Sequence, residues 1–115
     1  MKIEKFEDII AWEKAKSLTL KIYLHLKDLK DFAFRDQICR ASVSIMNNIA
    51  EGFERKSDNE FKHFLFIAKG SCGEVRSMLY LAKALNYMHE EEYLVLFNLS
   101  CEVSKMLSGL IKSLK

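Results

Sequence analysis

Four cations recur at every seventh position in the third quarter of the chain: Lys62, Lys69, Arg76 and Lys83. If this stretch is helical, the four stay on one narrow stripe, because a straight helix drifts only about 20° per heptad. Lysine and arginine neutralise phosphate groups, and such contacts bind RNA or DNA with little regard to base sequence. The same spacing relates two further pairs, Lys14 with Lys21 and Lys105 with Lys112. The spacing therefore predicts a nucleic-acid-binding stripe at residues 62–83.

A ladder of polar side chains steps by three or four residues through the preceding segment: Gln37, Arg40, Ser44, Asn47, Asn48 and Glu51. On a helix these positions form one continuous row. Arg40 and Glu51 are three turns apart and cannot pair with each other. We therefore expect each charge to meet a partner on another helix or another subunit, and Glu74 is the expected partner of Arg40.

Apolar residues flank this polar ladder on both sides, whereas a surface helix needs only one apolar stripe. One stripe contains Ile38, Ala41, Ile45, Ile49 and Phe53, and the other contains Cys39, Val43, Met46 and Ala50. The segment with the cations also has a face on which small residues alternate with aromatic ones. Apolar surface left over after internal packing usually marks an interface. We expect a homo-oligomer whose interface includes Val43, Met46, Phe66, Gly70, Gly73 and Tyr80, although a merely solvated face is the alternative interpretation.

Catalytic and metal chemistry find little support in the sequence. A di-iron bundle needs two Glu-x-x-His motifs, and this chain has one, Glu60-x-x-His63, in which helix capping explains the glutamate. Three cysteines without a CxxC pair are typical of reduced thiols that pack as small hydrophobic groups. A phosphate-binding loop motif is absent from the sequence. We therefore predict no enzyme activity, no metal site and no cofactor.

The composition describes the elements that must position these residues. A chain of 115 residues is long enough for one domain with a real core and too short for two. It has no proline and only four glycines, which argues against a β-sandwich or barrel. No apolar run approaches the roughly 18 residues that span a bilayer, and the N-terminal MKIEKFEDII does not have the pattern of a secretory signal. We expect no membrane association and a cytoplasmic location.

Helical periodicity and end signals predict four helices with short connections, at about 7–27, 32–54, 58–87 and 90–114. Ser57 and Glu60 have the S-x-x-E form of a capping box. Three glutamates, Glu90 to Glu92, suit the positive end of a helix dipole. We predict an all-α, antiparallel, up-down-up-down four-helix bundle that forms a single domain over residues 1–115.

Two segments also carry a resemblance: QICRASVSIMNNIAEGF at residues 37–53 and EFKHFLFIAKGSCGE at residues 60–74. With Trp12 and the ending at residues 106–111, they resemble bacterial proteins encoded by intervening sequences of 23S ribosomal RNA genes, formerly called S23 ribosomal proteins. The chain is also similar to the accessory variability determinants of diversity-generating retroelements. It departs from the pattern in lacking a proline before the second helix and in having Met46 where proline is frequent. The resemblance implies an antiparallel bundle that assembles as a barrel-like homopentamer, with nucleic-acid binding in some relatives and no assigned reaction.

Two functions of different classes remain open. The first is a non-enzymatic oligomeric bundle that binds RNA or DNA largely through backbone phosphates. The second is a homo-oligomeric scaffold or accessory protein that binds another protein, such as a reverse transcriptase, and in which the basic stripe is only a solvated face. The net charge of +2 is weak support for binding, although an oligomer would multiply the contacts. Because the sequence has no RRM-type aromatic motif, recognition is expected to be largely sequence-tolerant.

Overall fold

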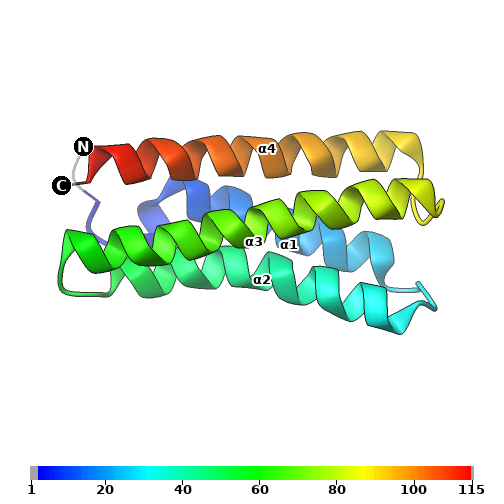
Figure 1. Cartoon of the computed structure of the whole chain (residues 1–115), viewed down its shortest axis with the longest axis horizontal. Helices are drawn as coiled ribbons and strands as arrows, with labels where there is room; N and C mark the ends of the chain where they lie inside the picture. The colour runs from blue at the N-terminus through cyan, green and yellow to red at the C-terminus, as the bar shows by residue number, and fades with distance from the viewer. Residues whose placement is uncertain (1–2, 115) are drawn as a thin grey trace.

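Four long helices account for most of residues 3–114, the part of the chain that the computed structural model describes: α1 (Ile10–Leu26), α2 (Phe32–Phe53), α3 (Asp58–Ala84) and α4 (Glu90–Ser113). A 3₁₀ turn, η1 (Phe6–Asp8), precedes α1. Consecutive helices run antiparallel, so both ends of the described chain lie at the same end of an elongated bundle (Figure 1). Its extents are 43 × 23 × 19 Å. The predicted all-α, up-down-up-down bundle is confirmed.

The order of the helices around the bundle determines which surfaces can form. Contacts join α1 to α2, α2 to α3, α3 to α4 and α4 to α1. Within residues 3–114, no Cα atoms of α1 and α3, or of α2 and α4, come within 8 Å of each other. Therefore α4 is flanked by α1 on one side and by α3 on the other, and α2 lies diagonally opposite.

Side-chain caps explain where the helices begin. The Ser57 hydroxyl accepts a hydrogen bond from the Glu60 backbone N–H at 3.2 Å, which confirms the predicted start of α3. Asp31 caps α2 by accepting from the Phe34 N–H at 3.2 Å. The same carboxylate accepts from the Tyr87 hydroxyl at 2.6 Å and so joins the α1–α2 and α3–α4 connections. This hydrogen bond lowers the pKa of Asp31 and raises that of Tyr87, because it stabilises the carboxylate and the neutral phenol.

Two predicted boundaries were wrong. We expected α3 to continue to residue 87, but it ends at Ala84. Asn86 adopts a φ of 60°, and the Tyr87 N–H donates to the Ala82 carbonyl, which is the bonding pattern of a Schellman cap. The first helix, expected over 7–27, begins only at Ile10 because the extended backbone of Ile9 separates η1 from α1 and directs a buried side chain into the core.

Aliphatic side chains from all four helices fill one continuous core. The largest fully buried ones are Leu18, Ile22, Leu26, Ile38, Ile45, Ile49, Leu65, Val75, Leu79, Leu96, Val103 and Leu107. The thiol of Cys72 is also buried and donates to the Ser100 carbonyl on α4 at 3.1 Å. Burial raises the pKa of this thiol to about 11, so it remains protonated at neutral pH. As predicted, the cysteines are free thiols: Cys39 and Cys72 are buried and Cys101 is half-buried.

By length and composition alone, α4 could cross a membrane, because an 18-residue window within it has a mean hydropathy of 1.4. The expectation from sequence considered only uninterrupted apolar runs, whereas this window tolerates charged residues; the absence of membrane association remains a prediction. In the fold, α4 buries Tyr93, Leu96, Ser100, Val103 and Leu107 against the other helices. Core helices of soluble bundles have the same length and composition, so the finding is weak support for a membrane span.

Candidate nucleic-acid interface

The heptad cations lie along the flank of α3 that faces α4. Lys83 Nζ is 3.4 Å from Glu90 Oε1 and 4.8 Å from the centre of the Tyr93 ring, both on α4. Arg76 donates to the Cys72 sulfur at 3.9 Å, and that thiol is bonded to α4. Lys62 and Lys69 precede Arg76 by two heptads and one heptad, so they lie on the same flank.

The cations of α1 face α4 from its other side. Lys14 Nζ is 3.3 Å from Glu102 Oε2 on α4, and Lys21 lies one heptad further along the same flank. Lys105 and Lys112 belong to α4 itself. Cations from three helices that are distant in sequence therefore border one helix: Lys14, Lys21, Lys62, Lys69, Arg76, Lys83, Lys105 and Lys112.

Carboxylates are confined to the ends and edges of the surface that α3 and α4 share. Within α3, Asp58 and Glu60 lie in the first turn, and Glu74 faces α2, where it accepts from Gln37 Nε2 at 3.1 Å. Within α4, three glutamates lie in the first turn, and Glu102 pairs with Lys14 on the α1 side. We call the surface between these positions the α3–α4 face; its residues are Lys62, Phe66, Lys69, Gly70, Gly73, Arg76, Ser77, Tyr80, Lys83, Leu94, Phe97, Cys101, Ser104, Lys105 and Lys112.

Exposed aromatic rings and small residues lie among these cations. Phe66 and Tyr80 are 56% and 59% exposed. A Cβ atom placed on Gly70 would meet nothing within 4 Å, and one on Gly73 would lie 3.8 Å from Arg76 Nη2. Residues that the sequence suggested for an oligomer interface and those suggested for phosphate binding therefore share one face. Sequence reasoning treated them as separate surfaces, because it could not tell which flank of α3 faces α4.

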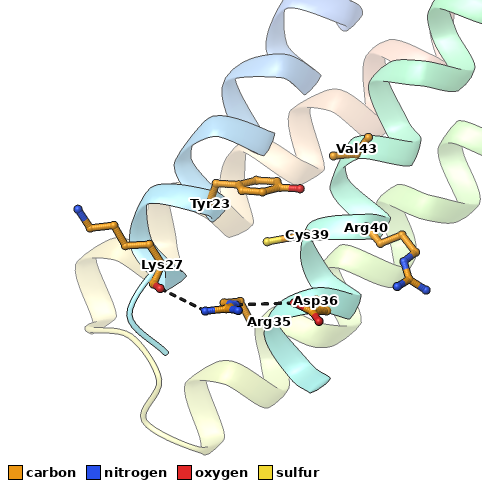
Figure 2. A pocket seen from close by; sticks show the side chains of 7 residues that line it. All are labelled: Tyr23, Lys27, Arg35, Asp36, Cys39, Arg40 and Val43. Carbon is orange, nitrogen blue, oxygen red and sulfur yellow. Dashed lines mark hydrogen bonds and ion pairs between the residues drawn. The ribbon is translucent and has the colours of Figure 1, made fainter. Parts of the chain in front are cut away.

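The other two predicted interface residues lie on α2, away from this face. Met46 is half-buried and packs against the core of its own chain. Val43 lines a hollow of about 540 Å³ between α1 and α2, together with Tyr23 and Cys39 (Figure 2). Within one chain, the six predicted interface residues do not form a single patch. Whether they form an interface remains a prediction.

The hollow between α1 and α2 has no evident reactive group. The Arg35 guanidinium donates to the Lys27 carbonyl at 3.3 Å and lies 3.8 Å from Asp36. The side chains of Lys27 and Arg40 point away from the hollow in Figure 2. Burial raises the pKa of the Cys39 thiol, which disfavours the nucleophilic thiolate. The hollow is therefore lined by the Tyr23 ring with its hydroxyl, by Cys39 and Val43, and by charged residues at its edge.

Two members of the polar ladder of α2, Gln37 and Ser44, bond to α3, whereas Asn48 bonds to Ser44 within α2. Gln37 bonds to Glu74, the Ser44 and Ser71 hydroxyls are 2.9 Å apart, and Asn48 Nδ2 donates to the Ser44 carbonyl at 2.8 Å. We call these contacts, together with the packing around Gly52, the α2–α3 seam. A Cβ on Gly52 would lie 2.6 Å from Phe64 Cβ, so only glycine allows this close approach. Sequence reasoning missed this role, although a glycine inside a predicted helix was the available signal.

Within one chain, the two charges of the ladder do not pair with another helix as expected, and partners on another subunit remain a prediction. Glu74 bonds to Gln37 rather than to Arg40, because Arg40 lies on the more outward flank of α2 and is exposed. Glu51 pairs with Arg55 at 2.9 Å, four residues along the chain, rather than with another helix. Asn47 is exposed.

Metal-binding arrangements are not found in the described part of the chain, where no three His, Cys, Asp or Glu side chains gather suitably. Glu60, from the Glu-x-x-His pair, takes part in the cap of α3, because its Oε2 accepts from the Ser57 hydroxyl at 3.4 Å.

Comparisons with known proteins extend these observations. Residues 7–109 match the sequence model of a family described as 23S rRNA-intervening sequence protein. The chain is also similar to a protein of unknown function from the S23 ribosomal protein family of Bacteroides thetaiotaomicron VPI-5482, whose crystal structure was determined at 1.70 Å. The two are 30% identical with a TM-score of 0.83, over 89% of this chain and 98% of the other. No curated protein matches. Neither match concerns the retroelement accessory determinants, so that part of the resemblance remains a prediction.

Proposed function

This chain belongs to the 23S rRNA-intervening sequence protein family, and we propose that it is a non-enzymatic, homo-oligomeric bundle that binds RNA or DNA through backbone phosphates. The similar solved structure is of a protein with unknown function, so the activity has to be argued from the surface. One observation carries the proposal: cations from three helices gather around α4, and carboxylates are displaced from the α3–α4 face.

Folding alone gives no reason for this gathering. Carboxylates of α4 face two of the cations, Lys83 and Lys14. In the described residues, neither Lys69 nor Lys105 forms an ion pair. A phosphate backbone supplies the missing negative charge along a line, as the heptad stripe would require.

The binding test uses fluorescence anisotropy with a labelled oligonucleotide of mixed sequence and a quadruple variant, K62Q/K69Q/R76Q/K83Q. We expect its affinity to fall roughly tenfold or more at low salt, by a similar factor for unrelated sequences, because phosphate contacts carry no sequence information. Lys83 is exposed and the other three side chains are half-buried. The fold should survive, because charges that remain in contact with water contribute little to stability.

A control with the same change of charge replaces four exposed cations outside the α3–α4 face, K5Q/K27Q/K30Q/K56Q. Its affinity should change by no more than about twofold, since distant surface charges are screened. If the wild type does not bind at low salt, or if both quadruple variants lose affinity equally, the stripe is a solvated face and the scaffold function is the better conclusion.

The assembly that we propose uses the α1–α2 side of the bundle, where Leu20, Tyr23 and Leu24 are exposed and Tyr23 also lines the hollow. In a ring of subunits, each chain contacts its neighbours through two different surfaces. The exposed side chains of α1 would form one of these surfaces and would meet a different part of the next subunit. Five copies would also multiply the phosphate contacts. The proposed location is the cytoplasm, where free thiols persist.

Light scattering coupled to gel filtration tests the assembly. We expect a mass several times 13.4 kDa, and five subunits are favoured. V43E should dissociate the oligomer into folded subunits, because it places a charge beside the hollow. The sequence placed Gly73 in the same interface, but we assign the α3–α4 face to nucleic acid, so G73E should leave the mass unchanged. A monomeric wild type contradicts the proposed assembly, and dissociation by G73E alone moves the interface to the α3–α4 face.

A further inference from the structure

Two aromatic rings lie within the cationic face and remain largely exposed, although one of them also contacts α4. Phe66 and Tyr80 are more than half exposed, although burying an aromatic side chain stabilises the folded state. They are 14 positions apart, or about 21 Å along the helix, and the helix drifts by only about 40° over two heptads. Both rings therefore lie on the same side of α3 as Lys69 and Arg76.

Three of the residues between the two rings have small side chains or none. Gly70, Gly73 and Ser77 lie between them, and the space around Gly70 is open to at least 4 Å. Tyr80 meets Phe97 of α4 edge to face, with ring centres 5.1 Å apart and planes at 69°, so its orientation is set by a neighbour while most of it remains exposed. A planar group therefore has room to approach either ring.

Alternating cations and exposed rings match the chemistry of single-stranded nucleic acid. Unpaired bases can stack on aromatic side chains while their phosphates meet lysine and arginine, and such stacking tolerates any sequence. Bases inside a duplex are already paired and stacked, so they cannot use the rings. We infer that the α3–α4 face binds single-stranded RNA or DNA in preference to duplex, with bases stacked on Phe66 and Tyr80.

This inference rests on the proposed nucleic-acid binding and adds the class of ligand. The test compares F66L/Y80L, which removes both rings, with F66Y/Y80F, which exchanges them and keeps a ring at each position. F32L is the control for location, because Phe32 is 57% exposed on α2 and also lies beside an arginine, Arg35. Three labelled probes are used: a single strand, the duplex of the same sequence, and a strand of equal length with abasic sites throughout.

For the intact single strand, F66L/Y80L should lose affinity by roughly tenfold per ring, whereas F66Y/Y80F and F32L should bind as the wild type does. Abasic strands keep the phosphates, so the wild type should bind them about as weakly as F66L/Y80L binds the intact strand. F66L/Y80L should show no further loss on the abasic probe, because base and ring act as one pair. Duplex affinity should be almost the same for all four proteins.

Each other outcome overturns the inference in a different way. If the wild type binds intact and abasic strands equally, and the K62Q/K69Q/R76Q/K83Q variant weakens both, phosphate binding stands and stacking is rejected. If the wild type binds none of the probes at low salt, the proposed function fails as well. If F66L/Y80L dissociates the oligomer in light scattering while F32L does not, a second copy of the chain covers the face.

Discussion

The two flanks of α3 differ in how far other parts of the same chain cover them. Toward α2, at the α2–α3 seam, Ser71 and Glu74 bond to side chains of α2, and Gly52 lets the backbones approach closely. On the α3–α4 face, Phe66 and Tyr80 remain exposed, and Gly70 has open space around it. On the first flank the polar side chains bond to α2. On the second, Tyr80 contacts Phe97 and Lys83 pairs with Glu90, yet both aromatic rings stay more than half exposed. This difference indicates that the α3–α4 face serves something outside the chain.

The contrast is sharpest between two glycines. Glycine inside a helix costs stability relative to alanine, so each needs a reason. At Gly52 the reason is visible, because a Cβ would lie 2.6 Å from Phe64 Cβ and 3.0 Å from Phe61 Cδ1. At Gly70 nothing within the chain requires glycine. Substituting each glycine with alanine tests whether the two positions differ in this way.

The larger effect is expected at Gly52. Gly52→Ala should lower the free energy of unfolding by about 1–3 kcal/mol, because the added methyl group overpacks the α2–α3 seam and neither partner can move freely. Urea denaturation followed by circular dichroism measures this change. An unchanged or higher stability would contradict the tight packing that distinguishes the seam from the α3–α4 face.

The smaller effect, of opposite sign, is expected at Gly70. Gly70→Ala should raise the free energy of unfolding of the subunit by up to about 1 kcal/mol, because alanine is the better helix former and meets no neighbour. The same urea titration, run on G70A beside the wild type, gives the sign. If G70A is instead destabilised and its oligomer dissociates in light scattering, another backbone approaches this position, and the α3–α4 face is an interface between subunits.

Much of the fold followed from the sequence because its signals are local. The Ser57 cap marks the start of α3 within one turn, and apolar periodicity identifies the core faces. The end of α3 was predicted at residue 87 because the apolar periodicity continues to that residue. The helix ends earlier because Asn86 adopts a positive φ, which asparagine tolerates. A C-terminal asparagine signal was therefore present in the sequence and was not used.

The candidate site was only half predictable. Each heptad stripe could be read within its own helix, but their convergence around α4 depends on the cyclic order of the helices. The predicted pair between Arg40 and Glu74 failed for a related reason. Helical spacing places Gln37 and Arg40 on the same side of α2, but it does not say which of them reaches α3. In the structure, Gln37 donates the hydrogen bond to Glu74. Long-range pairing of side chains requires the packed structure.

The salt dependence of binding tests the central claim most directly. The affinity of the wild type for the mixed-sequence oligonucleotide is measured from about 50 to 200 mM salt, beside the K62Q/K69Q/R76Q/K83Q and K5Q/K27Q/K30Q/K56Q variants. Each phosphate contact contributes about 0.7–0.9 to the slope of log affinity against log salt. We predict a steep slope for the wild type and the control, and a slope flatter by about 3 for the heptad variant. Equal slopes for all three proteins would contradict the account, because the α3–α4 face would then make no phosphate contacts.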